Sequence, residues 1–84
     1  MFSVTFARSA RKELEALPVS FKLKILEKIE QLGYEPYPHG CKKIKGTMQS
    51  YRIRIGDYRV IYDIDGKKKI IDIVVIRHRQ SAYK

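Results

Sequence analysis

The first residues alternate between apolar and polar side chains, the pattern of a strand with one buried face. Phe2, Val4 and Phe6 are separated by a serine and a threonine. A period of two residues sends successive side chains to opposite faces of a sheet. The pattern predicts an opening strand over residues 1–6.

Two stretches with helical spacing follow. Ala10, Leu14 and Leu17 recur on one helix face, and Pro18 ends that helix and starts the next. Gly33 follows the second helix as a residue that commonly ends one. The apolar stripe of this second helix consists of Phe21, Ile25, Ile29 and Leu32, with Leu26 beside it. We expect a helical hairpin whose apolar side packs on a sheet.

A strand hairpin is predicted in residues 51–62, which read Tyr-Arg-Ile-Arg-Ile-Gly-Asp-Tyr-Arg-Val-Ile-Tyr. Apolar and basic residues alternate on both sides of Gly56 and Asp57. These two residues suit a two-residue loop, with glycine at the position that a type II′ turn prefers. The loop fixes which residues of the two strands lie opposite each other.

This register gathers positive charge on one face of the sheet. It places Arg54 opposite Arg59 and Arg52 opposite Ile61, so three guanidinium groups share the face. Like charges directly opposite each other destabilise a sheet. We therefore expect this face to bind a polyanion, although a solvated strand face is the alternative for Arg52 and Arg54.

A second turn signal, Asp65-Gly66, precedes a third strand. Residues 67–69 are lysines that begin it, and the almost continuously apolar residues 70–76 predict a central strand buried on both faces. The predicted fold class is α+β. It comprises an N-terminal strand, a two-helix hairpin and an antiparallel three-stranded meander, forming one sheet with helices on one face and an open, basic opposite face.

Composition strengthens the expectation of an anionic partner. The 84 residues predict one domain over residues 1–84. Eighteen Lys and Arg against nine Asp and Glu give a net charge of +9 and a pI of about 9.9. A small domain this basic has the electrostatic footprint of a nucleic-acid binder, although high charge also aids solubility.

Several classes of protein are excluded at this level. Cys41 is the single cysteine, so no disulfide framework is expected, and no Cys/His spacing resembles a zinc site. No segment resembles a signal peptide or a membrane helix. We expect a cytoplasmic protein without metal, cofactor or membrane partner, in which Cys41 and His39 have no functional part.

Three segments resemble the RelE/ParE superfamily of toxins from type II toxin–antitoxin systems. They are the hairpin motif of residues 51–62, the closing Arg-His-Arg-Gln-Ser-Ala-Tyr of residues 77–83, and the basic Lys-Lys-Ile-Lys-Gly of residues 42–46. The element order matches over the whole chain. The C-terminal Arg77 and Tyr83 favour the RelE branch.

The resemblance implies a RelE-like fold and a ribosome-dependent mRNA endonuclease that cuts codons in the A site. It also implies a cognate RelB-like antitoxin, with the ribosome, mRNA and ribosomal RNA as further partners. The family's catalytic residues fall on Arg52, Arg54, Arg59, Arg77 and Tyr83. The best-known relatives carry lysine in place of the first two, and some continue into a longer C-terminal helix.

Metal-free RNA cleavage uses the ribose 2′-OH as nucleophile and gives a 2′,3′-cyclic phosphate or a 3′-phosphate with a 5′-OH. Arginine suits the stabilisation of the phosphorane, and we assign that part first to Arg59 and then to Arg77. It is a poor general base because the guanidinium stays protonated. Tyr83 is expected to stack on a base, to act as the general base, or only to pack.

Strand parity conflicts with the assignment of Arg77. A two- or four-residue loop at Asp65-Gly66 places His78 on the face of Arg59, together with Asp72, Val74 and Ile76. Regular alternation sends Arg77 to the opposite face, unless a bulge or the end of the strand intervenes. We favour Arg77 and keep His78 as a second candidate, because histidine titrates near neutrality.

Other interpretations stay open. Arg59 forms a structural ion pair with Asp63 or Asp72 in one of them, and Asp72 orients Arg59 in another. The remaining basic residues are expected to bind RNA phosphates, with a solvated loop as the alternative for the three lysines: Lys42, Lys43, Lys45 and Arg79. A ParE-like inhibitor of DNA gyrase and a non-catalytic RNA-binding module are the competing functions.

Overall fold

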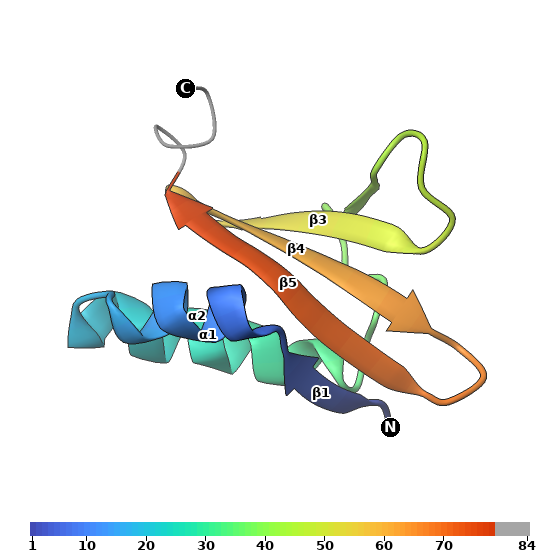
Figure 1. Ribbon diagram of the computed structural model, residues 1–84, viewed down its shortest axis with the longest axis horizontal. Helices are drawn as coiled ribbons and strands as arrows, with labels where there is room; N and C mark the ends of the chain where they lie inside the picture. The colour runs from blue at the N-terminus through green and yellow to red at the C-terminus, as the bar shows by residue number, and fades with distance from the viewer. Residues whose placement is uncertain (79–84) are drawn as a thin grey trace.

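The computed structural model describes residues 1–78, which form two helices and a five-stranded sheet. Figure 1 shows both helices on one side of the sheet. In chain order the elements are β1 (Ser3–Phe6), α1 (Arg8–Glu15), α2 (Val19–Leu32), β2 (Lys42–Lys43), β3 (Ser50–Ile55), β4 (Tyr58–Asp65) and β5 (Ile70–His78). The described part contains no helix long and apolar enough to cross a membrane.

The strands are arranged in the order β1-β5-β4-β3-β2. β1 runs parallel to β5, and the other neighbours are antiparallel. The predicted α+β class and its meander of three long strands are confirmed. The structure adds β2, which pairs Lys42 with Arg52 and Lys43 with Tyr51. Two residues are too few for an alternating pattern to be visible in a sequence.

Gly33 ends α2 for a different reason from the expected one. Its φ of −61° lies in the right-handed region, so no left-handed turn requires glycine there. A Cβ atom at Gly33 would instead lie 2.9 Å from the carbonyl oxygen of Phe2. The amide of Phe2 donates to the carbonyl oxygen of Gly33 over 2.7 Å. Glycine therefore allows the chain entering β1 to pack directly against the end of α2.

The core lies between the helices and one face of the sheet. α1 contributes Ala10 and Leu14, and three residues of the predicted α2 stripe are fully buried. Phe21, at the start of that stripe, is almost half exposed. The buried sheet residues are Ile53, Ile55, Val60, Tyr62, Ile64, Ile71, Ile73 and Ile76.

β5 lies inside the sheet, but only one of its faces is buried. Ile71, Ile73 and Ile76 face the helices, whereas Val74 and Val75 are only partly buried. The prediction that both faces are buried is wrong, because both helices lie on the same side of the sheet. Residues 67–69 also belong to the turn before β5 and not to the strand. The opposite face of the sheet is left open for the site.

Candidate functional site

The β3–β4 hairpin has the predicted turn and register. Gly56 has a φ of +60°, while Asp57 is not among the residues with positive φ, as a type II′ turn requires. Arg54 lies opposite Arg59. Arg52 lies opposite Ile61, two positions further along both strands, and so points to the same side of the sheet. The three arginines therefore share the face that points away from the helices.

A bulge in β5 adds Arg77 to this face. Ile61 lies opposite Val75, but its neighbour Tyr62 lies opposite Ile73, so Val74 is an extra residue on β5. The shift reverses the parity of the rest of the strand. Arg77 thus lies directly opposite Arg59, which resolves the predicted conflict in favour of Arg77.

The same bulge moves two of the other residues that parity placed on the face of Arg59, whereas Asp72, which precedes the bulge, stays on that face. Ile76 is buried in the core, and His78 lies opposite Tyr58 on the helix side. The prediction for these two residues is wrong because it assumed an uninterrupted strand. The rings of His78 and Tyr58 meet edge-on, with 5.2 Å between their centroids. The centroid of the Tyr58 ring also lies 5.6 Å from that of Phe21.

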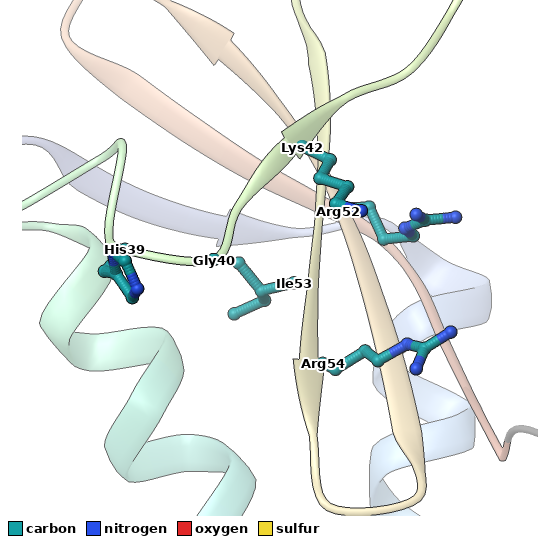
Figure 2. A pocket seen from close by; sticks show the side chains of 6 residues that line it. All are labelled: His39, Gly40, Lys42, Arg52, Ile53 and Arg54. Atoms are coloured by element: carbon teal, nitrogen blue, oxygen red, sulfur yellow. The ribbon is translucent and has the colours of Figure 1, made fainter.

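Five cations from four adjacent strands form what we call the cationic face: Lys42, Arg52, Arg54, Arg59 and Arg77. Residues directly opposite each other point to the same side of a sheet, so the pairing of Lys42 with Arg52 adds the lysine to this face. Figure 2 shows the side chains of Lys42, Arg52 and Arg54 pointing to one side of β3 and that of Ile53 to the other.

The remaining basic residues are placed elsewhere. Lys43 pairs with Tyr51 and so belongs to the helix side of the sheet, and Lys45 lies in the turn after β2. Arg79 and Tyr83 lie outside the described residues.

The carboxylates of the open face lie toward its other end. Asp63 pairs with Asp72, and neither lies opposite Arg59. Asp63 accepts a hydrogen bond from Ser50 Oγ, and Asp72 accepts one from Thr5 Oγ1 over 2.8 Å. Asp63 follows Arg59 by four positions along β4, or about 13 Å in an extended strand. The open face is therefore basic at one end and acidic at the other.

Arg77 also contacts α1. Its Nε lies 3.6 Å from Oε2 of Glu13, an ion pair that is partly exposed to solvent. β1 pairs only with the first half of β5, from Ile70 to Ile73. Beyond Ile73 the edge of β5 is free of a neighbouring strand in the described part, and α1 packs beside it. Glu13 reaches Arg77 across this edge.

A cavity of about 300 Å³ lies at the edge of β3, where β2 ends. Its lining includes His39, Lys42, Arg52 and Arg54. In Figure 2 the His39 ring lies next to α2, on the opposite side of β3 from the guanidinium groups. Sequence reasoning set His39 aside because residues 34–41 have no periodic pattern that could place it beside β3.

Within residues 1–78, no three His, Cys, Asp or Glu side chains gather closely enough to hold a metal ion. The chemical groups that the cationic face brings together are guanidinium and ammonium groups. They bind and stabilise phosphate through charge and N–H donors.

A five-stranded sheet with two helices on one face and this cationic opposite face defines a small α+β protein of the RelE type. Residues 4–83 match the family model of the ParE toxin of the parDE type II toxin–antitoxin system. The chain belongs to this toxin family, within the RelE/ParE superfamily that its motifs indicated.

Several relatives carry the RelE name. Toxin RelE3 of Methanocaldococcus jannaschii is 33% identical, with 95% of this chain and 93% of the relative covered. A chain of the archaeal RelE–RelB complex from Pyrococcus horikoshii is 36% identical, with a TM-score of 0.83 and coverage of 93% and 94%. A chain of the RelBE2 toxin–antitoxin complex from Mycobacterium tuberculosis is 28% identical, with a TM-score of 0.82 and coverage of 93% and 98%.

Proposed function

We propose that this toxin is a ribosome-dependent mRNA endonuclease, which cleaves codons in the A site and so inhibits translation in the cytoplasm. The opposition of Arg59 and Arg77 across β4 and β5 carries the proposal. Two guanidinium groups in this position repel each other in the free protein. A pentavalent phosphorane between them adds negative charge that both guanidinium groups can bind.

The cleavage step uses a nucleophile that the substrate itself provides. The ribose 2′-oxygen attacks the adjacent phosphorus, the bond from phosphorus to the 5′-oxygen breaks, and the 5′-oxygen leaves with a proton. The products are a 2′,3′-cyclic phosphate, which can open to a 3′-phosphate, and a 5′-OH. Donors aimed at the charge that develops contribute about 3–4 kcal/mol each to such a transition state.

The other cations of the face hold the RNA in position. Arg52 and Arg54 lie on β3 beside Arg59, and Lys42 extends the line of charge to the edge strand. A planar guanidinium can bind two phosphate oxygens at once. Positioning of the scissile linkage by the ribosome and by these contacts supplies much of the rate enhancement, which explains how few proton-transfer groups the face contains.

Tyr83 is proposed to contact the RNA, through its ring or its hydroxyl group. Tyr83→Phe keeps the ring and removes the hydroxyl, whereas Tyr83→Leu removes both. A loss of cleavage in both variants assigns the hydroxyl group, and a loss only in the leucine variant assigns base stacking. Full cleavage by both variants removes Tyr83 from the site.

A RelB-like antitoxin is the proposed protein partner. The related chains from Pyrococcus horikoshii and Methanococcus jannaschii were solved as RelE–RelB complexes. The net charge of +9 favours an acidic, amphipathic antitoxin segment over the cationic face. Such a segment neutralises the toxin because it excludes RNA from the arginines.

A translating extract tests the proposed function. Primer extension on the mRNA is expected to show cuts within A-site codons, and the purified antitoxin is expected to suppress them. DNA breaks that depend on gyrase, without mRNA cuts, would establish ParE-like inhibition instead; the relatives named RelE do not favour that outcome. Ribosome binding without cuts would show a non-catalytic RNA-binding module.

A further inference from the structure

The pairing of Arg59 with Arg77 raises the question of what holds Arg77 in place. Its side chain is 56% exposed, so packing alone does not fix it. A flexible, rotamer-rich side chain loses conformational entropy when it is ordered. Arg59, directly opposite, also repels it. An unsupported Arg77 would therefore spend much of its time away from the position in which both arginines meet one phosphate.

Glu13 provides the support from the neighbouring helix. α1 begins at Arg8, directly after β1 leaves β5 at Ile73. Ala10 and Leu14 are buried under the sheet, and Glu13 lies next to Leu14 with its side chain 32% exposed. The packing of α1 thus fixes the carboxylate beside the free edge of β5, within 3.6 Å of Nε of Arg77.

The atom that is held matters for the chemistry. Nε is the inner nitrogen of the guanidinium, and both Nη atoms lie beyond it. A carboxylate at Nε leaves two terminal nitrogens to bind two phosphate oxygens side by side. We propose that Glu13 is a positioning residue, which orients Arg77 so that its terminal nitrogens face the phosphate; this inference rests on the proposed function.

An alternative is that Glu13 competes with RNA for Arg77, and it makes a different prediction. If Glu13 competed with RNA for Arg77, loss of the carboxylate would strengthen binding and speed cleavage. If Glu13 positions Arg77, its loss leaves binding nearly unchanged and slows the chemical step. Measuring kcat and KM separately therefore distinguishes competition from positioning: competition changes both constants, whereas positioning changes kcat alone.

Glu13→Gln is the test variant, because glutamine keeps the size of the side chain and removes its charge. Glu15→Gln is the matched control: it removes the same charge from the exposed end of α1, two residues away. On programmed ribosomes we expect Glu13→Gln to lower kcat about three- to fivefold with unchanged KM, the range for a partly exposed ion pair. Glu15→Gln is expected to leave both constants unchanged.

A double-mutant cycle shows whether Glu13 acts through Arg77. In an Arg77→Ala background, Glu13→Gln is expected to have no further effect on kcat, because its target is absent. Equal losses in both backgrounds, or a rise in kcat on Glu13→Gln, would overturn the positioning role. Thermal melting of each variant checks that the fold is retained.

An NMR measurement reads the contact without any cleavage. The Nε–H signal of Arg77, assigned by its absence in Arg77→Ala, is expected to shift in Glu13→Gln and to stay in place in Glu15→Gln. An unchanged signal in Glu13→Gln would contradict the inference directly. If the wild-type protein cuts no mRNA, the proposed function fails, whereas this signal still decides whether Glu13 holds Arg77.

Discussion

At the scale of single residues, Arg59 and Arg77 place two like charges directly opposite each other. The proposed function gives this arrangement its use, because both can bind the phosphorane. Arg59→Ala removes a positive charge that lies opposite Arg77 and, in the proposed function, one donor to the phosphorane. We expect cleavage on programmed ribosomes to fall about 10²–10³-fold. The variant is expected to remain folded, because Arg59 lies on the open face and not in the core, and thermal melting checks this.

Lys67→Ala is the matched control for this variant. Lys67 is exposed in the turn between β4 and β5, away from the cationic face, and its replacement removes the same charge. It is expected to cleave at the wild-type rate. Wild-type cleavage by Arg59→Ala would show that the catalytic assignment is wrong.

Tyr62 gives the fold a measurable pH dependence. Its side chain is fully buried, its hydroxyl group donates to the carbonyl oxygen of Pro36 over 3.0 Å, and burial raises its pKa. A tyrosine in the unfolded chain titrates near pH 10. The folded protein holds the neutral phenol, so its stabilising effect is complete below about pH 10 and is lost as the pH rises further.

Urea denaturation of Tyr62→Phe and the wild-type protein tests this effect. At pH 9 we expect the variant to be less stable by about 1 kcal/mol, because it lacks the hydrogen bond. At pH 11 we expect the difference to shrink or reverse, because only the wild-type protein must keep a phenol neutral. Lysines titrate equally in both proteins, so a constant difference would show that Tyr62 does not cause the effect.

At the scale of elements, the junction between α2 and β1 depends on a missing side chain. Gly33→Ala places a Cβ against the carbonyl oxygen of Phe2, a backbone atom that cannot move cheaply. We expect a loss of about 1–3 kcal/mol in unfolding free energy, the range for overpacking. Gly66→Ala is the control, because nothing lies within 4 Å of a Cβ there and its φ is not positive. Equal stability of the two variants would contradict the close approach.

The sequence determines some elements more fully than others. The turn at Gly56 and Asp57 allows the whole β3–β4 register to be predicted, because a two-residue loop leaves one pairing. A bulge was one of two predicted ways to bring Arg77 to the face of Arg59, and the end of the strand was the other. The position of the bulge at Val74 could not be predicted, because Val74, Val75 and Ile76 are all apolar and no polar residue marks the change of face.

Parts of the site were beyond prediction for a related reason. β2 consists of two residues, and the loop that places His39 has no repeating pattern. The contact of Glu13 with Arg77 joins residues 64 positions apart. It follows from the end of β1 at Phe6, which frees the edge of β5, and not from any local signal in either segment.

At the scale of the whole molecule, charge is unevenly distributed over the open face. The cationic face lies at one end of the strands, and Asp63 and Asp72 lie at the other. In the proposed function, opposite potentials at the two ends would orient the protein during its approach to RNA as well as attract it. The basic end is expected to meet the phosphates first.

Binding to the ribosome should therefore depend strongly on salt. Each phosphate contact contributes a slope of about −0.7 to −0.9 to a plot of log K against log salt concentration. We expect Lys42→Ala to reduce the magnitude of the slope by about this amount, while Lys24→Ala, an exposed charge on α2, leaves it unchanged. Equal slopes for all three proteins would place Lys42 outside the RNA interface.

The parallel pairing of β1 with β5 has a consequence for how the toxin is made. Ser3 lies opposite Ile70, so the first strand has no partner until the residues of β5 have been synthesised. Such distant contacts form late, because the intervening loop must close first. The five-stranded sheet that presents Arg59 and Arg77 is therefore completed only after β5 has been translated.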